Sequence, residues 1–369
     1  MTKSWKWDQC VSHRGDEAGR FVSGYFSMAD RKSLLIAGAG FDPRATVVCR
    51  LLAASGTNIQ GFFVREERPS PSPEMIDRAE QNAADMASHL SHNTMHRVNV
   101  FAPDGAVIGG REIARILSKL PLARFTDVVV DISSLSIGVA YPIVRYLYER
   151  TGVDLGRVNL HVVATDCQAA DRAIVPIACD RVGTIVGFQG RFGLDDTVAA
   201  VKLWLPQLIL GKRAVLEKVF LLVNPEYVCP ILPFPASTPR LSDELVEHYR
   251  DEFESVWGVD DRDILYADEG NPLDLYRTVL RIDDARKRVF EGVGGSMVLL
   301  SPLGNKASAI GALMAAMERD FPVVYVESIG YMVDFAKLDG SVCNDDEVIH
   351  VWLHGDAYPA PQDRETMVL

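Results

Sequence analysis

The chain has 369 residues and a formal net charge of −12, and 48% of its residues are hydrophobic while 24% are charged. This length suits two domains, and the composition is that of a folded protein rather than a disordered one. The acidic balance argues against a surface for duplex nucleic acid, because neutralising phosphates requires clustered Lys and Arg. It leaves room for a local basic pocket that binds a small anionic ligand.

The cysteines and the apolar runs bear on the compartment. The six cysteines show no C-x-x-C spacing, so they predict neither a zinc site nor a disulfide framework, and we expect free thiols. No run approaches the roughly 18 apolar residues of a membrane span. The N-terminal residues lack the apolar core of a signal peptide. We therefore expect a cytoplasmic protein with no membrane contact.

Short β-branched runs alternate with longer amphipathic stretches, which is the pattern of βα units and a parallel sheet. In the first half we predict strands at residues 33–37, 59–64, 97–101, 127–131 and 159–164, and helices at residues 74–92, 110–119, 141–150 and 195–210. In the second half we predict strands at residues 218–223, 296–301, 322–327 and 348–353, and helices at residues 242–256, 273–291 and 307–318. The Pro-rich residues 225–240 predict an extended connection.

These elements predict an α/β protein with two Rossmann-like halves and mainly parallel sheets. We expect a first domain over residues 1–211, a second Rossmann-like domain over residues 212–358, and a disordered tail over residues 359–369. Residues 127–150 and 296–319 share one plan, an apolar strand, a Ser-containing turn and a helix that ends in Glu-Arg. The plan indicates two halves of related topology, although any two strand–turn–helix units share part of such a pattern.

Three turns that follow predicted strands carry the candidate binding residues. In open parallel sheets, ligands bind beyond the carboxyl ends of the strands, where helix N-termini attract anions. Each turn also has a purely structural explanation, because Gly forms turns, Ser and Asp cap helices, and a Lys at a helix start is often solvated. The candidates are Gly38, Gly40, Asp42 and Arg44 in the first turn, Asp131, Ser133, Ser134 and Ser136 in the second, and Gly304, Lys306 and Ser308 in the third.

The histidines give weaker indications. His89, His92 and His96 follow one another near the end of a predicted helix, but they lack an H-E-x-x-H spacing, and we predict no metal site. His161 lies inside an apolar strand and is expected to be a hydrogen-bonded core residue. The sequence identifies no catalytic residue and no cofactor.

Two local resemblances extend these predictions. Residues 38–45, GAGFDPRA, resemble the first motif of S-adenosylmethionine-dependent methyltransferases of the leucine carboxyl methyltransferase-like family. That resemblance implies a ribose held by an acidic residue after the next strand, at Glu66 or Glu67. Residues 301–308, SPLGNKAS, resemble the strand–Gly–Lys–helix turn of CRISPR-associated Rossmann-fold (CARF) ligand sensors. This second resemblance implies a nucleotide ligand, a homodimer or protein partner, and a role in prokaryotic defence.

The leading hypothesis is therefore a protein that binds a nucleotide or another phosphorylated small molecule and acts through a partner, as a sensor in a prokaryotic defence system does. The first alternative is an S-adenosylmethionine-dependent methyltransferase. The second alternative is a non-catalytic scaffold subunit, in which all three turns are structural.

Overall fold

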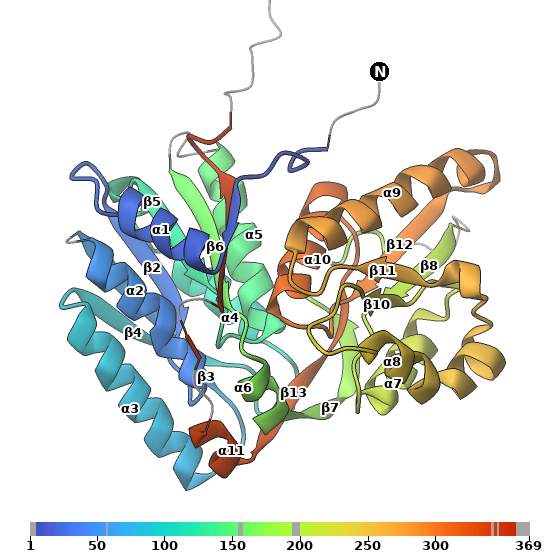
Figure 1. The fold of residues 1–369 in the computed structure, drawn as a ribbon, viewed down its shortest axis with the longest axis horizontal. Coiled ribbons are helices and arrows are strands. Elements are labelled where there is room, and N and C mark those ends of the chain that lie inside the picture. Colours follow the sequence, from blue (N-terminus) through green and yellow to red (C-terminus); the bar gives the residue numbers. More distant parts are fainter. Residues whose placement is uncertain are drawn as a thin grey trace, which may run out of the picture.

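A seven-stranded sheet forms the centre of the first lobe (Figure 1). The computed structural model describes residues 5–56, 58–153, 158–193, 200–340, 343–344 and 347–358. The strand order is β1-β14-β6-β5-β2-β3-β4; the strands from β6 to β4 run parallel, and β14 is antiparallel to both of its neighbours. These strands are β1 (Ser12–Arg14), β2 (Ser33–Gly38), β3 (Ile59–Glu67), β4 (Asn93–Asn99), β5 (Asp127–Asp131), β6 (Asn159–Thr165) and β14 (Val348–His354).

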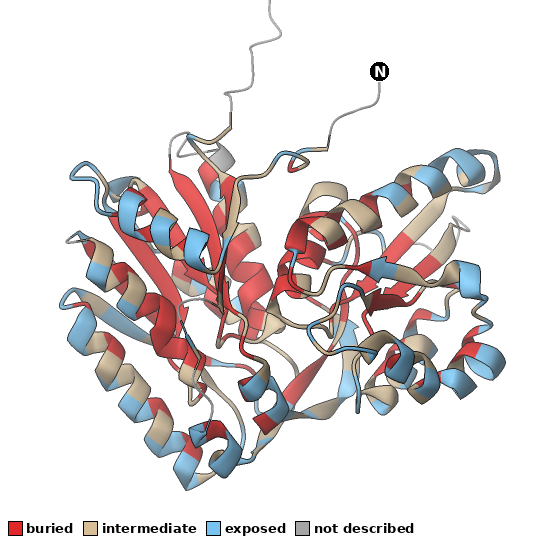
Figure 2. Cartoon of the chain, in the orientation of Figure 1, coloured by how far each residue is buried: buried red, intermediate tan, exposed pale blue. Residues whose placement is uncertain are grey.

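Helices cover both faces of this sheet because its central strands are apolar on both sides. Successive strand residues point to opposite faces, so Leu35 and Phe63 belong to one core cluster while Leu34 and Phe62 belong to another. The first face is covered by α1 (Asp16–Tyr25), α2 (Val47–Ser55) and α3 (Pro73–His89), and the second by α4 (Gly109–Leu117) and α5 (Ile137–Val153). Figure 2 shows the buried residues concentrated in the strands between these layers.

The second lobe contains a smaller parallel sheet in the order β12-β8-β9 and a parallel pair, β10 and β11. A long antiparallel ribbon of β7 and β13 runs between the two lobes (Figure 1). The strands are β7 (Ile174–Thr184), β8 (Val201–Pro206), β9 (Tyr227–Val228), β10 (Ile231–Pro233), β11 (Leu265–Ala267), β12 (Ser296–Ser301) and β13 (Val324–Val333). The remaining helices are α6 (Gln168–Ala173), α7 (Arg213–Val223), α8 (Leu241–His248), α9 (Pro272–Phe290), α10 (Lys306–Arg319) and α11 (Phe335–Asp339).

The two lobes share one apolar core. The cluster beneath α4 and α5 continues without a break into α9 and α10. The hydroxyl of Tyr141 in α5 donates to the carbonyl of Ala309 in α10 at 2.6 Å, and both residues are buried. This contact fixes α5 against α10, and the two helices begin at neighbouring points of the molecule.

The α/β class and the mainly parallel large sheet confirm the predicted fold class. Two predicted elements are wrong. Residues 218–223 lie in helix α7 rather than in a strand, and the segment 195–210 contains strand β8 rather than a helix, although residues 195–199 lie outside the described residues. Short apolar runs such as VFLLV are ambiguous by periodicity alone. In α7 the buried residues Leu216, Val219 and Val223 recur every three or four positions, which is helical spacing.

Two strand pairs join residues on opposite sides of the predicted domain boundary. β8, which precedes residue 211, pairs with β12, and β14 returns to the first lobe beside β6. The boundary between residues 211 and 212 stays a prediction. The predicted tail, residues 359–369, lies outside the described residues.

The prediction of free cysteines is wrong for one pair, because Cys167 and Cys343 form a disulfide, while the other four are free. Among the described residues, no helix has both the length and the apolar character needed to cross a bilayer.

Candidate functional site

A pocket of about 740 Å³ opens beyond the carboxyl ends of β2, β3 and β5, where it is closed on the other side by β13 and the start of α10. All three turns singled out in the sequence border it. The candidate residues that line it are Gly40, Asp42, Arg44, Ser133, Ser134, Ser136, Gly304 and Lys306.

The other three candidates lie behind the pocket wall. Gly38 ends β2, and a Cβ there would lie 2.5 Å from the Oγ of Ser134, so the close approach of the second turn requires a glycine. Asp131 is fully buried beneath the second turn. Ser308 donates its backbone N–H to the side chain of Asn305, which caps α10. These three residues shape the site from behind.

The first turn holds an ion-paired arginine. Arg44 is buried, and its guanidinium contacts the carboxylates of Asp42 and Asp171, each at 2.7 Å. Burial alone would lower the pKa of Arg44, but these two carboxylates outweigh it and raise the pKa. Asn82 of α3 donates to the carbonyls of Gly40 and Asp42 and so fixes the loop. The positive charge of Arg44 is therefore already matched within the protein.

The second turn has its hydroxyl groups engaged with its own neighbours. Ser133 donates to Asp131 through both its N–H and its hydroxyl, and its Oγ accepts from the N–H of Thr165. Ser134 donates to the carbonyl of Gly38 at 2.9 Å. Ser136 donates to the carboxylate of Glu66 from its N–H at 2.8 Å and from its hydroxyl at 3.0 Å. The turn is pre-organised rather than free.

Asp131 is a buried carboxylate with one oxygen, Oδ2, that has no hydrogen-bond partner among the described residues. Burial raises its pKa to about 7, against the hydrogen bonds from Ser133 and the charge of Lys306, which lower it. Near neutral pH this group therefore exchanges between its neutral and charged forms.

The third turn presents the least-matched cation of the pocket. The ammonium group of Lys306, at the first position of α10, donates to the carbonyl of Leu135 at 3.0 Å. In the described ranges it has no carboxylate within ion-pair distance, so two of its three N–H groups remain for a ligand. Burial, and then the charge of Arg44, lower the pKa of Lys306.

No pattern in the sequence predicts that β13 forms a wall of the pocket. Arg68 joins Glu66 at the end of β3 to Glu327 of β13, with distances of 2.6 and 2.8 Å. Tyr325 and Tyr331 of β13 line the pocket, and in the described part of the chain neither hydroxyl has a hydrogen-bond partner. The only sequence signal was a glutamate flanked by tyrosines within an otherwise apolar strand, which periodicity does not connect to β3.

Apolar side chains also line the pocket. They include Met75, Ile76 and Ala79 of α3, Ile177 of β7 and Ile329 of β13. Phe41 packs edge-on against Tyr331, with ring centroids 5.4 Å apart. The pocket thus combines apolar and charged groups, as a site for a base or ring joined to a polar group does.

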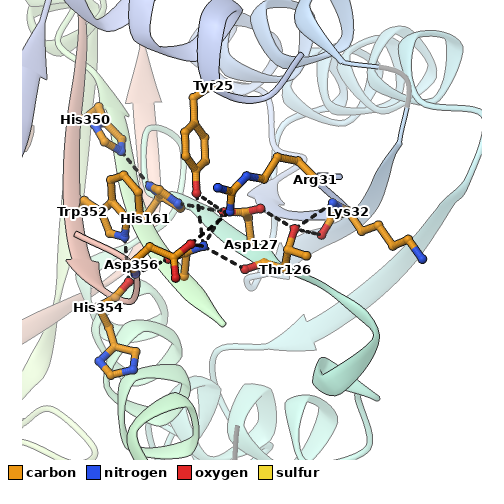
Figure 3. Close-up of polar contacts among 11 residues, drawn as sticks. Tyr25, Arg31, Lys32, Thr126, Asp127, His161, His350, Trp352, His354 and Asp356 are labelled. Carbon is orange, nitrogen blue, oxygen red and sulfur yellow. Dashed lines mark hydrogen bonds and ion pairs between the residues drawn. The ribbon is translucent and has the colours of Figure 1, made fainter. Parts of the chain in front are cut away.

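A second polar cluster lies at the opposite end of the strands, around Asp127 at the start of β5 (Figure 3). Asp127 accepts hydrogen bonds from Tyr25, Asn159 and Thr126 and lies 3.4 Å from Nε2 of His161. Burial would raise the pKa of Asp127, but the hydrogen bonds from His161 and Thr126 keep it below its usual value. This cluster joins α1 to the strands.

Three histidines extend from Asp127 toward the sheet edge. His161 Nδ1 lies 2.9 Å from His350 Nε2, and His350 Nδ1 lies 3.0 Å from His13 Nδ1. Burial lowers the pKa values of His161 and His350, so both rings are neutral at pH 7. Because an ionised Asp127 only accepts, His161 then donates from Nε2, His350 donates from Nε2, and His13 donates from Nδ1. This pattern needs neutral rings at His161 and His350, whereas His13 donates from Nδ1 in either of its protonation states. His161 is thus a hydrogen-bonded core residue, as the sequence predicted, in a chain that the sequence did not reveal.

The three histidines named for a possible metal site have different surroundings. His89 ends α3 beside Asp85, and His92 is exposed. His96 of β4 stacks on Phe62 of β3. Within the described residues these three do not gather with the spacing of metal ligands.

The chain has little similarity to known proteins. No family model and no curated protein matches the chain. Among solved structures, the UDP-GlcNAc 2-epimerase from Neisseria meningitidis bound to UDP-GlcNAc is similar at 9% identity, over 81% of this chain and 95% of that chain, with a TM-score of 0.21. So loose a superposition supports no inference about this chain, and the function must be argued from its own residues.

Proposed function

We propose that this protein binds a nucleotide or another phosphorylated small molecule in the pocket between β2, β3, β5 and β13. The observation that carries the proposal is the position of Lys306, whose ammonium group lies among three strand-end turns and lacks a carboxylate partner in the described chain. A phosphate oxygen is a suitable acceptor for its free N–H groups. The apolar lining residues Met75 and Ile76 suit the ring of such a ligand.

The charges of the pocket limit how anionic the ligand is. Arg44 and Arg68 are each held between two carboxylates, and Arg65 and Arg97 pair with Glu67 and Glu80. Among the cations that line the pocket, Lys306 is the one with no ion pair in the described residues. A strongly anionic ligand would face the carboxylates of Asp42, Glu66 and Asp171, which line the pocket, with little compensation. A ligand with few negative charges fits better.

Further features belong to the same proposal. The resemblance of residues 301–308 to CARF sensors supports a dimer that passes the binding event to a partner, within prokaryotic defence. A cytoplasmic location is part of this proposal. The Cys167–Cys343 disulfide is a testable counter-indication, because disulfides are rare in most cytoplasms.

A methyltransferase is the second candidate, and one observation favours it. β2 and β3 are adjacent parallel strands with Gly38 opposite Val64, so the Gly38–Ala39–Gly40 turn lies beside Glu66 and Glu67. This is the arrangement in which a glycine turn and a carboxylate hold a ribose in Rossmann-like sites. S-adenosylmethionine would use this side of the pocket without needing Lys306.

Thermal unfolding against a ligand panel separates the candidates. The panel contains AMP, ATP, NAD, cyclic di- and trinucleotides and S-adenosylmethionine, tested with the wild type and Lys306→Met. A ligand at a hundredfold excess over its Kd adds about 2.7 kcal/mol, which raises the Tm by a few degrees. A nucleotide shift that Lys306→Met abolishes supports the proposal. A shift with S-adenosylmethionine alone, retained in the variant, supports the methyltransferase, and no shift with any ligand supports the scaffold.

A further inference from the structure

A carboxylate of the protein occupies the position directly before α5, beside this pocket. The first N–H groups of a helix lack intrahelical acceptors and attract negative charge. Glu66 Oε1 accepts from both the N–H and the hydroxyl of Ser136, directly before α5. The sequence analysis named Ser136 as a candidate binding residue, and in the structure its N–H and hydroxyl are engaged by a glutamate oxygen.

A second carboxylate approaches the same helix turn. The side chain of Glu327 is 2% exposed, and its Oε2 has no hydrogen-bond partner among the described residues. That oxygen lies so close to Gly138 that a Cβ there would be 2.2 Å away from it. The glycine therefore opens the first turn of α5 to a carboxylate oxygen.

Arg68 holds both carboxylates in position. Its Nη1 contacts Glu66, its Nη2 contacts Glu327, and its Nε donates to the carbonyl of Ser328 at 2.9 Å. All three charged side chains are at most 10% exposed, so this arrangement is screened little by solvent. Lys306 contacts the same turn, where it donates to the carbonyl of Leu135.

We propose that Glu66 is a specificity-determining residue that occupies the anion site at α5 and so restricts the pocket to ligands with a single phosphate group, which Lys306 binds. A second phosphate would need the place that Glu66 holds and would meet its negative charge there. The oxygens of Glu66 accept hydrogen bonds, so a hydroxyl-bearing ligand, such as a nucleoside monophosphate or a sugar phosphate, is favoured. The inference rests on the proposed function, and it adds the class of ligand.

Isothermal titration with AMP, ATP and inorganic pyrophosphate tests this assignment. The proteins are the wild type, Glu66→Gln, Glu66→Ala and, as the matched control, Glu112→Gln. Glu112 of α4 also accepts a backbone N–H, that of Asn99 at 2.7 Å, but does not line the pocket. The wild type should bind AMP at least as tightly as ATP. Removing the charge of Glu66 should tighten ATP and pyrophosphate relative to AMP by on the order of tenfold, and Glu112→Gln should keep the wild-type order.

The outcomes distinguish the two claims. If the wild type binds ATP much more tightly than AMP, or if both Glu66 variants keep the wild-type ratio, the assignment of Glu66 is wrong while ligand binding stands. The ratio of AMP to ATP affinity is measured on the wild type itself. The assignment can therefore be refuted even if a variant fails to fold. If no folded protein in the series binds any of the three probes, the proposed function and this inference both fall.

Discussion

Replacing His350 with glutamine should remove part of the acid sensitivity of this protein. His350 is fully buried between His161 and His13, and Phe21 of α1 stacks on it with ring centroids 4.4 Å apart. Burial, and then the charges that His161 and His13 would carry, hold the pKa of His350 well below its usual value. Among the charged groups around the chain, Glu17 raises the pKa of His13, while Asp127 and Asp356 raise that of His161 and Arg31 lowers it.

The sign follows from where the proton binds. In the unfolded chain a histidine titrates near pH 6.5, whereas in the native state His350 stays neutral to much lower pH. Below pH 6.5 the unfolded state therefore takes up a proton that the native state refuses. Each such histidine lowers the free energy of unfolding by up to about 1.4 kcal/mol per pH unit, and the stability is fully present only above that range.

The difference in free energy of unfolding between the wild type and His350→Gln isolates the contribution of His350. Asp131, whose pKa is raised to about 7, acts in the opposite direction, because its native state takes up a proton before the unfolded state does. Both proteins carry Asp131, so its contribution cancels. The stability advantage of the wild type over His350→Gln should shrink by about 1 kcal/mol between pH 6.5 and pH 5.5.

Urea unfolding at four pH values between 7.5 and 5.0 measures this quantity. His92→Gln is the control, because His92 is an exposed histidine at the end of the α3 segment. Its stability curve should stay parallel to that of the wild type. Parallel curves for the wild type and His350→Gln over the whole range would refute the reasoning.

Two further predictions concern the pocket and its frame. Arg44→Met leaves the carboxylates of Asp42 and Asp171 without their shared cation. Because Asp171 is 38% exposed, the variant should lower the free energy of unfolding in urea by at most about 3 kcal/mol. An unchanged urea midpoint would contradict the buried ion pair. Reduction of the Cys167–Cys343 disulfide, which closes a loop of 176 residues, should lower the Tm of the wild type by several degrees and leave that of Cys343→Ser unchanged. An equal response of both proteins to the reductant would show that the bond is absent.

The sequence predicted the central strands β2, β3, β5 and β6 well because they are largely buried, whereas it missed β1, and the mostly exposed β4 begins at Asn93 rather than at the predicted residue 97. Near-continuous apolar runs such as residues 33–37 and 127–131 leave few alternatives when turn residues bound them. The same rule failed at residues 218–223, where an equally apolar run forms α7. The apolar run alone does not distinguish a strand from a helix there, and the distinction becomes visible only in which residues of α7 pack against the core, Leu216, Val219 and Val223.

The candidate site shows the same limit. Three turns were found one by one, because each combines a strand end with glycine, serine or lysine, and the structure brings all three to one pocket. The ion-pair chain from Glu66 through Arg68 to Glu327 joins residues about 260 positions apart and leaves no local pattern. For the same reason, the pairing of Cys167 with Cys343 and the chain of three histidines were not visible in the sequence.

The most direct test of the pocket is an equilibrium titration of AMP against the wild type, Lys306→Met and Lys212→Met. Lys212 is a matched control, because it is also partly buried and donates to a backbone carbonyl, that of Pro176, but does not line the pocket. If Lys306 binds the phosphate, its loss should weaken AMP binding by on the order of tenfold or more, while Lys212→Met binds as the wild type does. Equal affinity of all three proteins for AMP would contradict the account, and so would the absence of AMP binding by the wild type.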